Sequence, residues 1–147
     1  MVSRIINLYR RSDSVEVLNS IQILRAKNNQ SVSASVITLD SDLSRKMIDG
    51  FWWSDSGLSN ASKREGDSHW IWEDIVTDYS KDNLHECIAI LSQEQYLEGA
   101  MAYRLDAKSK IEIGKGSIYV GWLATAPRNR NWLTNKPFYK AIGTVLL

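Results

Sequence analysis

The residues best suited to chemistry lie in the last thirty positions of the chain. An apolar run over residues 118–126 ends at Pro127, and a loop follows before an apolar segment of helical spacing that begins at about Ala141 and runs through Gly143. The loop and its margins carry four cations, Arg128, Arg130, Lys136 and Lys140. A strand, a loop and a helix start in this order can present free backbone amides to an anion. The pattern therefore predicts a phosphate-binding segment.

Charge is unevenly distributed along the 147 residues. From residue 113 onward there are five Lys or Arg and no Asp or Glu, whereas residues 1–112 hold 13 basic and 17 acidic residues. A cationic C-terminal end would suit an anionic cofactor, and a solvated charged face is the alternative. Two arginines and one tryptophan at 128–132 are too few to predict a nucleic-acid partner.

Length and composition favour a single domain, residues 1–147, with a substantial core. No stretch is apolar and long enough to cross a bilayer, and the N-terminus lacks the apolar centre of a signal peptide. The single cysteine, Cys87, lies in an apolar run and reads as a buried thiol in a reducing compartment. We therefore expect a cytoplasmic protein without a membrane partner.

Hydrophobic periodicity predicts the helices that must position the loop. Residues 33–39 read as a strand, and Asp40 and Ser41 then offer N-cap side chains to a helix that reaches Phe51. A loop is expected over residues 54–67. A second helix is expected from about Ser68, with an apolar stripe of Ile71, Trp72, Ile75, Val76 and Tyr79.

Three further strand-like runs follow, at residues 86–91, 96–105 and 117–126. The short turns between them predict an antiparallel meander. Because the helices are grouped rather than alternating with strands, the fold class is α+β.

The C-terminal part of the chain resembles the GNAT family of N-acetyltransferases. The resemblance rests on Tyr119-Val120-Gly121-Trp122-Leu123-Ala124-Thr125-Ala126-Pro127, on Arg128-Asn129-Arg130, and on Tyr139-Lys140-Ala141-Ile142-Gly143-Thr144-Val145-Leu146-Leu147. These segments match the family's fourth strand and acetyl-CoA-binding loop, and they cover about a fifth of the chain. The implied fold is the GNAT-like acyl-CoA N-acyltransferase fold.

The resemblance assigns cofactor contacts to particular positions. The backbone of Leu123, Ala124 and Thr125 would pair with the pantetheine arm, as an added strand would. The pyrophosphate would be wrapped by a loop of Lys140, Ala141, Ile142, Gly143 and Thr144. Phe138 stands where the family has Arg or Gln, so Lys140 or Arg130 would replace that donor. Ala141 stands at the family's first glycine, which requires that this position does not need a positive φ.

Catalytic groups are less well marked. Glu112 and Tyr119 lie where some family members place a general base or its water relay. His69 reads as a general base or as a surface histidine. No metal site is expected, because His85 and Cys87 share a strand face without a third ligand nearby, and a core thiol beside a rim histidine is the competing interpretation.

Four tryptophans flank the 54–67 loop among several carboxylates: Trp52, Trp53, Trp70 and Trp72. Aromatic rings beside carboxylates could receive a cationic amine, and packing between helices with solvated acids is the alternative.

The family continues beyond the helix at which this sequence ends. We therefore expect the chain to hold the N-terminal part of the fold, with the C-terminal portion missing. The implied function is transfer of an acyl group from acetyl-CoA to a primary amine. The alternative is a non-catalytic remnant or interaction module that associates through its exposed sheet edge, as a homo-oligomer or with a partner that completes the sheet.

Overall fold

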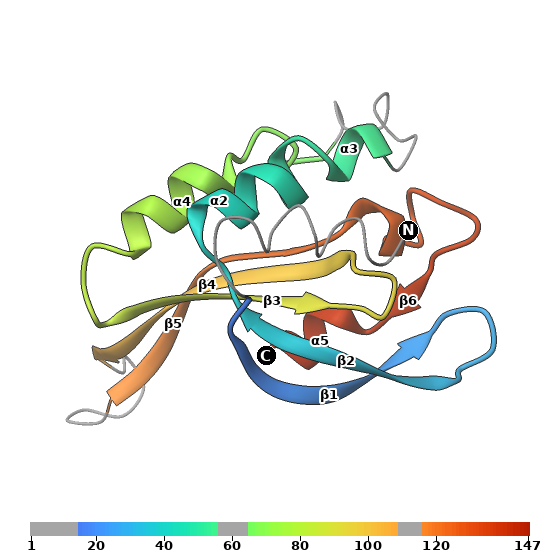
Figure 1. The fold of residues 1–147 in the computed structure, drawn as a ribbon, viewed down its shortest axis with the longest axis horizontal. Coiled ribbons are helices and arrows are strands. Elements are labelled where there is room, and N and C mark those ends of the chain that lie inside the picture. The colour runs from blue at the N-terminus through green and yellow to red at the C-terminus, as the bar shows by residue number, and fades with distance from the viewer. Residues whose placement is uncertain (1–14, 56–64, 109–115) are drawn as a thin grey trace.

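The computed structural model describes residues 15–55, 65–108 and 116–147. Its centre is an antiparallel sheet in the order β5-β4-β3-β2-β1-β6, which curls strongly (Figure 1). The strands are β1 (Val17–Arg25), β2 (Ser31–Thr38), β3 (His85–Leu91), β4 (Leu97–Lys108), β5 (Gly116–Thr125) and β6 (Tyr139–Lys140). The predicted α+β class is confirmed, and so is the antiparallel meander of β3, β4 and β5.

The first helical segment lies where the sequence predicts it, but it is not one continuous helix. It divides into α2 (Ser41–Ser44), a π-helical turn η1 (Arg45–Asp49) and α3 (Trp52–Asp55). The Asp40 carboxylate accepts a hydrogen bond from the Leu43 N–H at 2.7 Å and so provides the predicted N-cap.

The second helix, α4 (Trp72–Tyr79), begins four residues later than predicted. The preceding residues form a turn in which the Trp70 N–H donates to the Asp67 carbonyl at 3.0 Å. Asp49 then caps α4 from a distance in sequence, because its carboxylate accepts from the N–H groups of Trp72 and Glu73 at 2.7 and 2.9 Å. Ile71 does not join the predicted stripe, since it precedes the helix and is 52% exposed.

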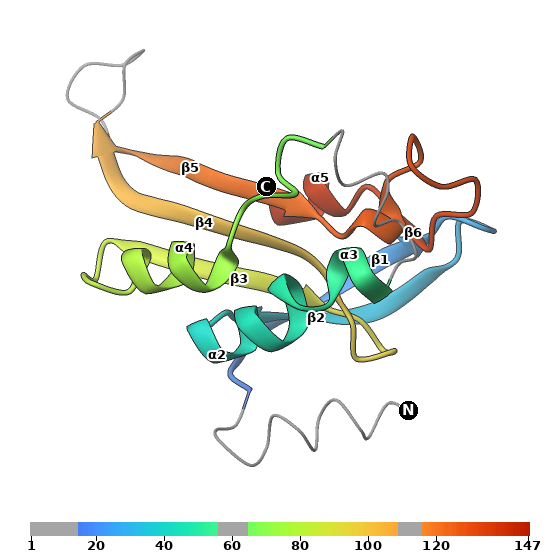
Figure 2. The ribbon, with the colours of Figure 1, turned by 90° about the horizontal axis from the view of Figure 1, so that it is seen from above.

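The sheet has a core on each face. Ala89 and Ala100 face α2, α3 and α4, whereas their neighbours Ile90 and Met101 face the opposite core. This second core contains α5 (Ile142–Leu146), which lies within the curl of the sheet (Figure 2). Side chains that alternate along each strand therefore separate the two cores. None of the helices in the described ranges has both the length and the apolar character needed to cross a membrane.

The C-terminal segment follows the predicted order of strand, loop and helix start. β5 leads into a 3₁₀ turn, η3 (Pro127–Asn129), and the chain then crosses to β6, which pairs with β1 through Leu24 and Lys140. Gly99 on β4 leaves the space into which α5 packs. A Cβ at that position would lie 2.6 Å from Ile142 Cγ2 and 3.0 Å from Leu146 Cδ1.

Candidate functional site

The outer edge of β5 is the first component of the site. Ala126 donates its N–H to the Glu98 carbonyl at 2.9 Å, and Ala124 lies opposite Ala100 in the same ladder. Because backbone direction alternates along an antiparallel pair, Ala124 bonds to β4, whereas the N–H and C=O groups of Leu123 and Thr125 point away from it. Within the described part of the chain, β5 pairs with β4 alone. This edge therefore offers backbone donors and acceptors to a ligand.

Arg130 binds one of these edge groups, the Thr125 carbonyl. Its Nε and Nη2 donate to the Thr125 carbonyl at 3.0 and 2.7 Å, and its Nη1 donates to Glu65 and Asp67 at 2.9 and 2.7 Å. Trp132 Nε1 also donates to Glu65, at 2.9 Å. Arg130 is only 4% exposed. Burial opposes its charge, but the two carboxylates hold its pKa above the ordinary value. The network connects the 65–67 segment to the end of β5, and of the two edge groups of Thr125 it engages the carbonyl and leaves the N–H open.

Beside this edge lies a hollow of about 270 Å³, built by the turn that enters α5. Gly143 adds no side chain to it, and a Cβ there would lie 3.8 Å from Thr125 Cγ2. Lys140 is exposed at its margin. Six of the predicted cofactor positions line this hollow: Thr125, Lys140, Ala141, Ile142, Gly143 and Thr144. Leu123 and Ala124 lie further back along β5, and Arg130 lies in the network described above.

Ala141 adopts the left-handed conformation, with φ 60° and ψ 25°. The family resemblance tolerates alanine at this position only if no positive φ is needed, and this condition is not met. An L-residue in this region costs about 1–2 kcal/mol. The packing of α5 holds the strained turn, because Ile142 and Leu146 are buried against the sheet.

Tyr119 and Glu112 are the two candidate catalytic residues. Tyr119 lies on β5 and is 62% exposed, and it pairs with Arg104 of β4 in the ladder. Glu112 lies outside the described residues. Tyr119 is not among the residues that line the hollow.

The tryptophans near α3 and α4 support the packing interpretation. Trp52 is buried and donates from Nε1 to the Leu97 carbonyl at 2.9 Å. Trp70 stacks edge-on with Trp122, their ring centroids 4.8 Å apart, and also contacts Trp72. Trp53 faces the Arg130 guanidinium, whose Cζ lies 5.2 Å from its ring centroid. The nearby carboxylates are engaged as well, since Asp49 caps α4 and Asp67 binds Arg130.

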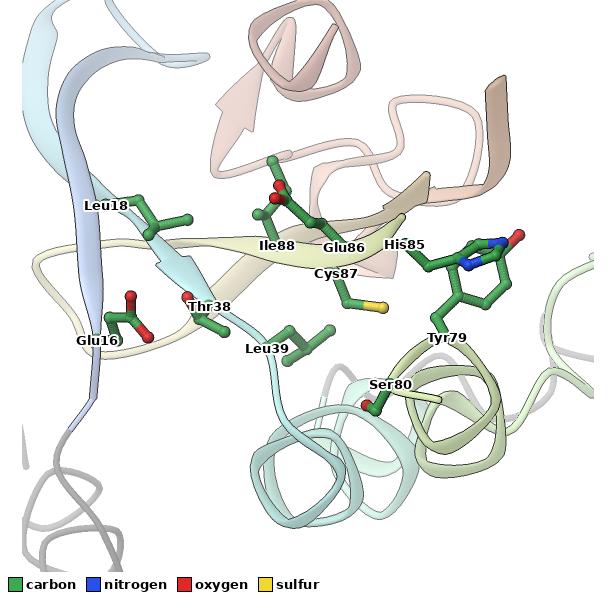
Figure 3. Close-up of a pocket in the computed structure, with 10 residues that line it drawn as sticks. All are labelled: Glu16, Leu18, Thr38, Leu39, Tyr79, Ser80, His85, Glu86, Cys87 and Ile88. Carbon is green, nitrogen blue, oxygen red and sulfur yellow. The ribbon is translucent and has the colours of Figure 1, made fainter. Parts of the chain in front are cut away.

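The histidines and the cysteine lie elsewhere. His69 is exposed. His85 Nδ1 lies 2.6 Å from Asp82 Oδ1, and its ring packs edge-on against Tyr79. Cys87 points from β3 toward Leu39 and Ser80, into a hollow of about 280 Å³ (Figure 3).

Burial raises the pKa of the Cys87 thiol to about 12, so it stays protonated and unreactive at neutral pH. In the described ranges, no three His, Cys, Asp or Glu side chains gather as a metal site would require. These features agree with a core thiol beside a rim histidine.

Sequence reasoning missed several residues that line the hollow. They are Asn129, Asn131, Trp132, Pro137 and Tyr139. Trp132 carried a usable signal, since it lies in a predicted loop outside the apolar runs of the strands and helices, and it is 68% exposed. Tyr139 carried none, because its burial depends on β1 and on the Glu94 carboxylate that accepts its hydroxyl at 2.6 Å.

Comparison with known proteins adds no assignment, since no family model, no curated protein and no solved structure matches this chain.

Proposed function

We propose that this chain binds acetyl-CoA along the outer edge of β5 and is a GNAT-like N-acetyltransferase domain that transfers the acyl group to a primary amine. The observation that carries the proposal is the open edge of β5 beside the hollow at the entry to α5. Pantetheine contains amide groups, so it can pair with a strand edge as a peptide does. The N–H of Leu123, which lies further back along that edge from the hollow, would donate to the thioester carbonyl and stabilise the oxyanion that forms there.

The pyrophosphate of the cofactor would occupy the hollow at the entry to α5. Gly143 allows close approach of the backbone, the Thr144 hydroxyl can donate, and exposed Lys140 supplies positive charge. Arg130 has a different role in this proposal. Because its guanidinium is bound by Glu65, Asp67 and the Thr125 carbonyl, it positions the strand end rather than the phosphates.

The attacking amine must be neutral, so a base or a water relay must take its proton. Tyr119 and Glu112 are the candidates that the family resemblance offers for this step. Transfer then forms an amide bond, breaks the thioester bond and releases the CoA thiol.

Calorimetric titration of the chain with acetyl-CoA tests the proposal. Gly143→Val should abolish binding, because its methyl groups fill the space beside Thr125. Lys140→Ala should weaken binding by about 1–2 kcal/mol, as expected for one charge-assisted contact. Lys81→Ala is the matched control, since Lys81 follows α4 and pairs only with Asp78 among the described residues. Equal and negligible effects of the first two changes would contradict the proposed site.

The second candidate function is an interaction module that associates through β5. Ile118 and Tyr119, both on this edge strand, are 64% and 62% exposed. Unpaired strand edges with apolar side chains favour association. Sedimentation at increasing concentration distinguishes the two: association that acetyl-CoA does not alter, together with no calorimetric signal, would favour the module.

A further inference from the structure

A second and larger hollow lies where the β1–β2 turn meets the loop before β6. Its volume is about 700 Å³, and its charged and aromatic lining is Arg25, Lys27, Lys136 and Phe138. We call it the Arg25–Phe138 groove. Both views place these two segments at the same end of the molecule (Figures 1 and 2). The Ala26 N–H donates to the Phe138 carbonyl at 3.0 Å, so the backbone joins the two walls. A groove of this size suits a nucleotide-sized ligand.

The groove is cationic. Lys27 and Lys136 are exposed, and among the residues that the structure describes neither has an acidic side chain within ion-pair distance. In the described ranges, the carboxylate within ion-pair distance of these cations is that of Glu94, which lies 3.7 Å from Arg25 and also accepts the Tyr139 hydroxyl. Three cations against one shared carboxylate favour a ligand with more than one negative charge.

Phe138 adds a flat aromatic surface to these charges. The Arg128 guanidinium lies on this ring, with its Cζ 4.0 Å from the centroid, and the ring is still 50% exposed. Arg128 is itself fixed, because Nε donates to Glu98 at 3.0 Å and Nη2 donates to the same buried carboxylate. The Arg128 Cζ also lies 3.7 Å from the centroid of the Tyr96 ring. A ring held in this way can stack on a planar base with little loss of conformational entropy.

We infer that the Arg25–Phe138 groove binds a purine nucleotide that carries more than one phosphate, with the base on Phe138 and a phosphate dianion on Arg25, Lys27 and Lys136. Under the proposed function, on which this assignment of the source rests, the ligand is the 3′-phosphoadenosine end of CoA, whose 3′-phosphate lies on these cations while its pyrophosphate lies in the hollow at the entry to α5. Pro137 lines both this groove and the hollow at the entry to α5, so one extended molecule can reach both. A free purine nucleotide is the other source of the same chemistry.

Titration with four ligands separates these possibilities: acetyl-CoA, acetyl-pantetheine, adenosine 3′,5′-bisphosphate and ATP. We expect acetyl-CoA to bind at least tenfold more tightly than acetyl-pantetheine, which lacks the nucleotide. Adenosine 3′,5′-bisphosphate should compete with acetyl-CoA, and added salt should weaken both. The double variant Lys27→Ala/Lys136→Ala should lose about tenfold or more in affinity for acetyl-CoA and none for acetyl-pantetheine. Phe138→Leu should weaken nucleotide binding several-fold, and Lys81→Ala should change nothing.

Each outcome tests one of the two proposals. Unchanged acetyl-CoA affinity in the double variant, with equal binding of acetyl-CoA and acetyl-pantetheine, would overturn the groove and leave the proposed function standing. Binding of adenosine 3′,5′-bisphosphate and ATP that depends on Lys27 and Lys136, without any contribution from pantetheine, would uphold the groove for a free nucleotide and contradict the proposed function. No binding of any nucleotide would overturn the groove.

Discussion

Replacing Gly99 with alanine should displace α5, on which the proposed site depends. A Cβ at residue 99 would lie 2.6 Å from Ile142 Cγ2 and 3.0 Å from Leu146 Cδ1, whereas carbon atoms in contact prefer about 3.5–4.0 Å. The helix must therefore move by about 1 Å. Overpacking of this kind costs about 1–3 kcal/mol. Because a five-residue helix has little stability of its own, α5 cannot absorb the strain without losing its position.

Urea unfolding, followed by tryptophan fluorescence, measures this effect within a double-mutant cycle. Ile142→Ala alone should cost about 2–5 kcal/mol. The double variant Gly99→Ala/Ile142→Ala should cost at least about 1 kcal/mol less than the sum of the two single-variant costs, because Ile142→Ala removes the Cγ2 atom that clashes with the new Cβ. Gly121→Ala is the control for coupling: its Cβ would clash with the Tyr79 hydroxyl, away from Ile142, so its cost should add to that of Ile142→Ala. Additivity of Gly99→Ala and Ile142→Ala would refute the packing argument.

Three further predictions concern single residues. Cys87 should react with iodoacetamide at pH 8 about a thousandfold more slowly in the folded than in the urea-unfolded chain. The reason is that a pKa of about 12, against an ordinary value of 9.0, lowers the fraction of Cys87 that is thiolate by that factor. The contribution of the buried thiol to the free energy of unfolding is therefore fully present below pH 9 and is lost as the pH rises toward 12. Similar labelling rates in the folded and unfolded chains would contradict this. Arg130→Met should destabilise the fold by about 3 kcal/mol by leaving Glu65 and Asp67 unpaired, whereas Arg45→Met, at a 57% exposed side chain, should cost under about 1 kcal/mol by the same urea assay. Ala141→Gly should raise stability by up to about 1 kcal/mol because it relieves the positive φ, and a loss of stability would argue against that backbone conformation.

Local patterns predicted much of the fold. The meander of β3, β4 and β5 was predictable because its turns are short and its strands are rich in apolar residues. The N-cap at Asp40 was predictable because it contacts a residue only three positions away. The start of α4 was not, because Asp49 caps it from 23 residues earlier in the chain.

The candidate site was less accessible to sequence reasoning for the same physical reason. The sequence predicted the C-terminal segment that builds the hollow. The role of Arg130 could not be predicted, because it depends on Glu65 and Asp67, which lie more than sixty residues away in the chain. The Arg25–Phe138 groove joins a turn near the start of the chain to a loop near its end. No periodicity in either segment indicates the other, because only the curl of the sheet brings them together.

The most direct test of the account is the response of the β5 backbone to acetyl-CoA. In amide-resolved NMR of the ¹⁵N-labelled chain, the N–H signals of Leu123 and Thr125 should shift on titration, because these groups point to the open edge. The signal of Ala124, whose N–H is bonded within the sheet, should shift far less, and so should that of Lys81 at the end of α4. If acetyl-CoA leaves Leu123 and Thr125 unshifted, or shifts all four signals equally, the central claim that this strand edge receives the cofactor is wrong.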